Sequence, residues 1–195
     1  ALPILGVQLF FVLSGFLITG ILLDARRDKH YLPDFFRRRA LRIFPLYYLS
    51  LMVLLIAVPA FGLQVPACAD GGPQAPYWLF YSNWTQPYLA HESNCVDQFW
   101  SLAVEEQFYL LWPLLLWFCR RPRDVLILCL VVALSAVITR MAMWSWQASP
   151  VAIYQFTVTR MDALALGGAA ACWWRMPAPA DWLRRHAGLG LWLAG

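Results

Sequence analysis

The feature that most constrains this chain is a series of apolar segments, each long enough to cross a lipid bilayer. A membrane-spanning helix needs about 20 consecutive, mostly apolar residues. The first 23 residues contain no Asp, Glu, Lys or Arg, and neither does segment 43–69. In the 195-residue chain 61% of residues are hydrophobic and 13% are charged, whereas a soluble domain has about 25% charged residues. The composition predicts an integral membrane protein and excludes a disordered tail or a nucleic-acid-binding module.

The predicted fold class is all-α, a polytopic bundle of transmembrane helices with five spans and the start of a sixth. Helices are expected because backbone groups in the hydrocarbon core must be satisfied within the segment itself. The first residue is not Met and the last apolar run stops after nine residues, so we expect one domain, 1–195, truncated at both ends. The expected spans are about 3–23, 43–63, 99–118, 125–146, 151–174 and 187–195 onward.

The basic residues predict how the spans are oriented. Thirteen of the 15 Lys and Arg residues lie in three alternate connections, within 26–42, 120–123 and 175–185. The intervening loop 64–98 contains none. Connections rich in Lys and Arg stay in the cytoplasm. We therefore expect a multi-pass protein of the inner (plasma) membrane whose loop 64–98 is extracytoplasmic.

Two features of loop 64–98 are left open by the sequence. Cys68 and Cys95 lie where a disulfide can persist, but the sequence does not decide whether they are bonded. Asn83 begins an Asn-Trp-Thr triplet that matches the glycosylation acceptor pattern, which matters only in a eukaryotic secretory pathway.

Five charged residues lie inside the predicted spans: Glu105, Glu106, Arg140, Arg160 and Asp162. Ionisable groups in hydrocarbon cost at least a few kcal/mol each, so they normally face a cavity and pair with one another. A rise of about 1.5 Å per residue places all five in the outer half of the bilayer, on three different helices. Glu105, Arg160 and Asp162 are our candidate catalytic residues. The alternative is an ion pair that only holds the bundle together.

Helical spacing predicts which of these side chains share a face of their helix. Ser101, Glu105 and Tyr109 recur every four residues and share one face, while Glu106 points about 100° away. Side chains two positions apart do not face each other on a helix. The partners of Arg160 and Asp162 must therefore come from other helices.

Arg39 and Arg42 form a second candidate site on the cytoplasmic side. Arginines at positions i and i+3 lie on one helix face, where two guanidinium groups can clamp a phosphorylated cofactor. Basic residues below a span can also serve only to anchor it and to bind anionic lipid. Spacing alone favours this second interpretation.

Four segments together resemble the membrane-bound acyltransferase 3 family, whose members O-acylate carbohydrates of the cell envelope. Their order and spacing match over nearly the whole chain. The segments are GVQLFFVLSGFLIT (6–19), RRALRIFPLYY (38–48), FWSLAVEEQFYLLWP (99–113) and RMDALALG (160–167).

The resemblance implies an enzyme, an acyltransferase built on a ten-helix domain. It implies transfer from acyl-CoA, with acetyl-CoA the simplest choice, and no metal. The acceptor would be a hydroxyl of a carbohydrate such as lipopolysaccharide, exopolysaccharide or peptidoglycan. By position, Arg39 and Arg42 match the family's Arg-x-x-Arg pair for the donor, and Glu105, Arg160 and Asp162 match its polar residues.

The resemblance also implies something that this chain does not contain. The family's catalytic histidine lies on a helix that would precede residue 1, and His30, His91 and His186 do not match it. We therefore expect these 195 residues to be inactive by themselves, and the intact protein to be an acyltransferase. The alternative function is a proton-coupled secondary transporter, because such carriers also use intramembrane carboxylates and arginines.

Overall fold

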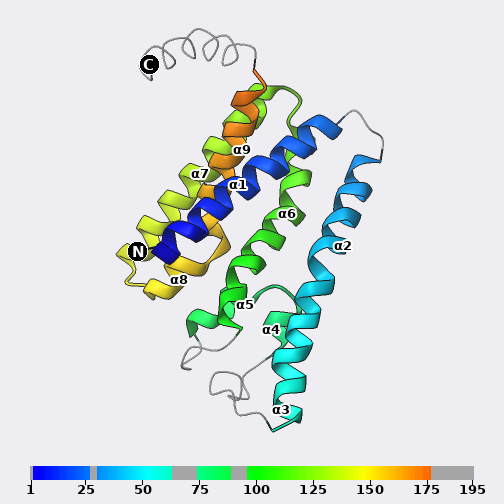
Figure 1. Cartoon of the computed structure of the whole chain (residues 1–195). Coiled ribbons are helices and arrows are strands. Elements are labelled where there is room, and N and C mark those ends of the chain that lie inside the picture. Colours follow the sequence, from blue (N-terminus) through cyan, green and yellow to red (C-terminus); the bar gives the residue numbers. More distant parts are fainter. Residues whose placement is uncertain (1, 27–29, 63–73, 89–95, 177–195) are drawn as a thin grey trace, which may run out of the picture.

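The computed structural model describes residues 2–26, 30–62, 74–88 and 96–176 (Figure 1). Every regular element within these ranges is helical, which confirms the predicted all-α class. The elements are α1 (Leu2–Ala25), α2 (Tyr31–Leu51), the π-helix η1 (Met52–Ala57), α3 (Val58–Ala60), α4 (Ala75–Trp78), α5 (Ser82–Thr85), the 3-10 helices η2 (Gln86–Tyr88) and η3 (Asp97–Phe99), α6 (Trp100–Phe118), α7 (Pro122–Ser145), α8 (Pro150–Gln155) and α9 (Thr157–Trp174).

Three helical segments in the described ranges are long and apolar enough to cross a membrane: Leu5–Ala25, Tyr31–Ala60 and Pro122–Ser145. They match the first, second and fourth predicted spans. The third and fifth predicted spans coincide with α6 and with α8 and α9, which carry four of the five intramembrane charges; Arg140 is on α7. The sixth predicted span, 187–195, lies outside the described residues.

The second predicted span, 43–63, differs from the observed helix at its start. The helix begins at Tyr31 and continues through η1 and α3 to Ala60. Charge alone set the predicted boundary, but the arginines before residue 43 favour helix as well as leucine does. Near the other end, Pro59 lacks an N–H and crowds the carbonyl of Leu55, and the six residues before Val58 adopt the wider π-helix.

The fifth predicted span, 151–174, is two helices. Phe156 is extended (φ −64°, ψ 137°) and separates α8 from α9. The break is stabilised from outside, since Asn83 Nδ2 donates to the free carbonyl of Gln155 (3.2 Å). Hydropathy does not reveal this break, because both halves are apolar.

The bundle is built around α9, which packs along α1 on one side and α7 on the other (Figure 1). Glycine allows the α1–α9 approach. A Cβ atom at Gly167 would lie 2.0 Å from the carbonyl oxygen of Val12, and one at Gly15 would lie 1.9 Å from that of Leu164. The backbones of the two helices therefore touch, as small residues permit in membrane bundles.

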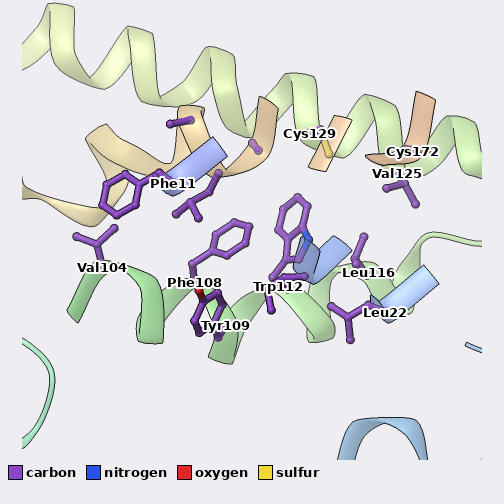
Figure 2. Close-up of a cluster of buried hydrophobic side chains, with 14 of the residues drawn as sticks. Phe11, Leu22, Val104, Phe108, Tyr109, Trp112, Leu116, Val125, Cys129 and Cys172 are labelled. Atoms are coloured by element: carbon purple, nitrogen blue, oxygen red, sulfur yellow. The ribbon is translucent and has the colours of Figure 1, made fainter. Parts of the chain in front are cut away.

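Helix α6 supplies the large side chains of the core. Figure 2 shows Phe108 and Trp112 projecting from α6 toward α7, while Tyr109 points elsewhere. The Trp112 ring is stacked on Phe108 (4.7 Å between centroids), and its Nε1 donates to Thr19 Oγ1 of α1 (2.8 Å). On the other side of α6 lies α2, whose contacts with α6 form the candidate site.

Candidate functional site

Glu105 lies in the second turn of α6 and is 2% exposed. Its Oε1 atom is buried and has no hydrogen-bond partner among the described residues. The hydroxyls of Tyr109 and Ser14, which are hydrogen-bonded to each other, interact with the Glu105 carboxylate, and so does the charge of the Arg39 guanidinium. The predicted common face of Glu105 and Tyr109 is therefore observed. Ser101, the third member of that face, donates a hydrogen bond to the backbone carbonyl of Gln98, in the 3-10 turn just before α6.

Arg39 is placed among these groups, not apart from them. Its guanidinium carbon lies 4.3 Å from the centre of the Tyr109 ring, a cation–π contact. Its charge also acts on Glu106, the next residue of α6. The sequence suggested two separate sites, a donor clamp and an outer polar layer. The structure brings Arg39 of the first together with Glu105 of the second.

A cavity of about 410 Å³ lies between α1 and α2. Arg38, Arg39 and Arg42 line its α2 wall, and the α1 wall is apolar, including Leu17 and Leu22. The two arginines of the predicted clamp therefore face the same space. Arginines beside an apolar wall suit a ligand that carries phosphates and a hydrocarbon chain.

A second cavity, of about 340 Å³, lies between α2, α6 and the segment after α4. Arg39, Glu106 and Tyr109 line it, together with aromatic side chains that include Phe44 and Phe80. Arg39 is thus a wall of both cavities. Phe80 belongs to the loop predicted to be extracytoplasmic, whereas Arg39 belongs to the connection predicted to be cytoplasmic.

The remaining charges form another cluster, on α7 and α9. Arg140 Nη2 donates to Asp162 Oδ2 (2.6 Å), which confirms that the partner of Asp162 comes from another helix. Arg160 is buried; its Nε donates to Tyr154 O (2.6 Å) and its guanidinium lies 3.9 Å from the centre of that ring. Among the described residues, no hydrogen bond or ion pair joins Arg160 or Asp162 to Glu105.

The segment around α4 and α5, which was predicted to be the outer loop, has residues buried against the bundle, and apolar periodicity did not indicate this. Asn83 is 0% exposed and donates to Thr157 Oγ1 (2.8 Å). Its amide is therefore engaged inside the protein, and the glycosylation pattern is not an accessible site in this fold. Burial raises the pKa of the Tyr77 phenol, so Tyr77 stays a neutral donor to Asp97. Cys68 and Cys95 lie outside the described residues.

Three of the five cysteines lie in the part of the chain that the structure describes. Burial raises the pKa of Cys119, beyond the end of α6, so its nucleophilic thiolate is disfavoured. Cys129 and Cys172 are buried. Within the described ranges, no three His, Cys, Asp or Glu side chains gather as metal ligands do.

Comparisons with known proteins identify the family of this chain. A family model described as an acyltransferase domain matches residues 4–195. The chain is 35% identical over 189 residues to a putative peptidoglycan O-acetyltransferase, YrhL, of Bacillus subtilis, covering 88% of this chain and 29% of that protein. It is 31% identical over 185 residues to the peptidoglycan O-acetyltransferase OatA of Listeria monocytogenes (87% and 29%). It is 34% identical over 188 residues to the O-acetyltransferase OatA of Staphylococcus aureus (87% and 30%).

The chain thus spans less than a third of the length of these curated relatives. No solved structure matches it.

Proposed function

Since this chain belongs to the acyltransferase 3 family, we propose that it forms part of a membrane O-acetyltransferase that acts on a cell-wall carbohydrate. The donor is acyl-CoA, with acetyl-CoA the expected form, and the acceptor is a sugar hydroxyl. Three relatives carry names of O-acetyltransferases, and two of those names specify peptidoglycan. Family membership favours this function over the transporter that the intramembrane charges also allowed.

The observation that carries the proposal is the position of Arg39 between the two cavities. An enzyme that joins a cytoplasmic donor to an external acceptor needs two sites that meet inside the membrane. Arg39 lines both the arginine-rich cavity and the cavity that contains Glu106. We assign the first to the donor and the neighbourhood of Glu105 to the reaction.

In the donor cavity, Arg39 and Arg42 bind phosphate groups of the acyl-CoA. Guanidinium groups suit phosphates because they offer several donors in a fixed plane. The apolar α1 wall, which includes Leu17, then accommodates the hydrocarbon part of the donor. In the proposed orientation in the membrane, the arginine end of the cavity faces the cytoplasm and loop 64–98 lies on the opposite side.

For the reaction, we propose that a histidine of the complete protein, as the family resemblance implies, removes the proton of the acceptor hydroxyl while its oxygen attacks the thioester carbonyl carbon. The C–S bond then breaks, and the departing thiolate takes the proton from the histidine and leaves as the free thiol of CoA. Glu105 orients the histidine or the sugar. Arg39 remains a donor-binding residue whose charge lies near Glu105. A buried arginine, Arg160, is proposed to stabilise the oxyanion of the intermediate.

Arg160 and Asp162 complete the proposed catalytic set from α9. Arg160 is held by Tyr154 and keeps a buried positive charge without a carboxylate partner among the described residues. Asp162 binds Arg140 through Oδ2, while its Oδ1 is buried and unpartnered. These two groups are proposed to position the substrate.

The test is Glu105→Gln in the complete protein, assayed for acetyl transfer in nanodiscs. The change removes the charge and keeps the shape, so we expect turnover to be abolished while acetyl-CoA binding and thermal stability are retained. Arg123→Ala, an exposed change at the start of α7, is the control. Turnover at the wild-type rate in Glu105→Gln would assign Glu105 a structural role.

A further inference from the structure

The second cavity has the lining of a carbohydrate-binding site. Ligand sites combine apolar and aromatic walls with a few fixed polar groups, in volumes of about 300–1,000 Å³. This cavity, of about 340 Å³, has Phe44 and Phe80 on one side and Glu106 on another. Glu106 Oε1 is buried and accepts no hydrogen bond from the described residues. Glu106 is thus the carboxylate among the residues that line this cavity.

Phe80 is held in an unusual backbone conformation. Its φ of 53° lies in the left-handed region, which a bulky residue avoids unless its surroundings impose it. Its ring is stacked on Tyr47 (4.3 Å between centroids, 21° between planes) and lies 5.6 Å from the ring of Phe44. Tyr47 therefore holds the Phe80 ring in place, and Phe80 lines the cavity whereas Tyr47 does not.

Gln107 fixes the backbone of Phe80 from α6. Its Nε2 donates to Phe80 O (2.7 Å) and to Asn83 Oδ1 (2.9 Å). Its Oε1 accepts from Trp84 Nε1 (3.1 Å) and from the Thr157 hydroxyl. Both amide hydrogens and both lone pairs are used. Gln107 therefore connects α6 to the segment 80–84 and to Thr157, and its amide is not available to bind a ligand.

The same network reaches the break between α8 and α9. Asn83 donates to Thr157 Oγ1 and to Gln155 O, on the two sides of Phe156. The Phe156 ring is stacked on Trp84 (4.6 Å). Hydrogen bonds of Gln107 and Asn83 therefore join the segment 80–84, α6 and α9. Gln107 directly follows Glu106 in the sequence.

We propose that this cavity binds a sugar ring of the acceptor, stacked on Phe80, with Glu106 accepting a hydrogen bond from a sugar hydroxyl. Gln107 is the positioning residue that holds Phe80 in place. A pyranose has a face of C–H bonds, which packs on an aromatic ring, and a rim of hydroxyls, which donate to a carboxylate. The assignment rests on the proposed function, and it puts the acceptor on the opposite side of Arg39 from the donor.

The test measures acetyl transfer by the complete protein from acetyl-CoA to chitotetraose, a soluble N-acetylglucosamine oligosaccharide, with separate KM values for the two substrates. Phe80→Leu removes the flat ring and should raise the acceptor KM about tenfold, the loss of one aromatic contact. The donor KM should stay unchanged. Phe80→Tyr keeps the ring and should keep the wild-type acceptor KM.

Gln107→Glu removes both donors to the outer segment at constant shape, and we expect the same selective rise in acceptor KM. The matched control is Gln98→Glu, the same chemical change at an exposed position just before α6. Phe118→Leu, at the exposed far end of α6, is the control for Phe80. Thermal melting establishes that each variant is folded.

The outcomes separate the two proposals. Absence of acetyl transfer by the wild-type protein, to chitotetraose and to peptidoglycan, would overturn the proposed function. Transfer with an acceptor KM unchanged by both Phe80→Leu and Gln107→Glu would overturn the acceptor site and leave the function standing. A rise in both KM values together would also overturn it, because the effect would then not be specific to the acceptor.

Discussion

The contact between α1 and α9 gives a prediction whose magnitude follows from the structure. A Cβ atom at Gly167 would lie 2.0 Å from Val12 O and 2.7 Å from Phe16 N, and both neighbours are backbone atoms that cannot rotate away. Gly167→Ala must therefore push the helices apart by more than 1 Å, since real Cβ contacts are essentially never under 3.0 Å. A gap of about 0.5–1 Å already loses a quarter to a half of the dispersion energy of each atom pair.

We expect Gly167→Ala to cost about 3 kcal/mol, the upper end for overpacking, because two rigid backbones are in contact. For a chain of this length that corresponds to a fall in melting temperature of about 6–12 °C. Tryptophan fluorescence during heating in detergent measures it. Gly6→Ala is the matched control, because nothing lies within 4 Å of a Cβ there. Equal melting temperatures for the two variants would refute the close α1–α9 contact.

Three further predictions concern polar contacts between helices. Thr19→Val should cost about 1–3 kcal/mol in unfolding experiments, because it leaves the indole N–H of Trp112 buried without an acceptor. Asp162→Leu should lower the free energy of unfolding by about 2–3 kcal/mol, less than for a fully buried ion pair because Arg140 is 30% exposed. The double variant Asp162→Leu/Arg140→Met should recover that stability. Its acetyl transfer should still fall if Asp162 has the proposed catalytic role. Arg175→Ala should change stability by less than about 1 kcal/mol, because its partner carboxylate is 64% exposed, and a larger loss in the same melting assay would contradict this.

The positions of the helices could be predicted from the sequence because membrane insertion depends on local composition. Uncharged runs located the long helices α1 and α7 to within a few residues. Two boundaries failed for physical reasons. Arginines do not end a helix, so α2 starts at Tyr31 and not at residue 43. The break at Phe156 depends on Asn83, a partner more than 70 residues away, which no local pattern reveals.

Spacing predicted two contacts within the candidate site but not how its parts are arranged. Spacing indicated that Glu105 and Tyr109 share a face, and that Asp162 pairs with another helix. The distribution of basic residues assigned Arg39 to a connection between spans, separate from the intramembrane charges, because the predicted spans ended at charged residues. The contact of Arg39 with Tyr109 depends on the approach of α2 to α6, and its signal in the sequence was the helical continuity of 31–42 with the span.

Gln107 was missed for a similar reason. A glutamine beside two glutamates looks like an ordinary polar residue of a helix, and the triplet at Asn83 suggested surface exposure. Only the fold shows that the half-buried amide of Gln107 donates to the buried amide of Asn83. Amide pairs of this kind carry no charge and no periodicity, so a single sequence gives little warning of them.

The central claim is that Arg39 and Arg42 hold the donor, and acetyl-CoA binding tests it most directly. Isothermal titration of the complete protein in nanodiscs would compare the Arg39→Ala/Arg42→Ala variant with Arg120→Ala/Arg123→Ala, a pair of exposed arginines outside both cavities. Each lost hydrogen bond to a charged group is worth about 1.5–3 kcal/mol, so the first variant should bind at least about 100-fold more weakly. The second should bind as the wild type does. Wild-type affinity in the Arg39/Arg42 variant would contradict the account.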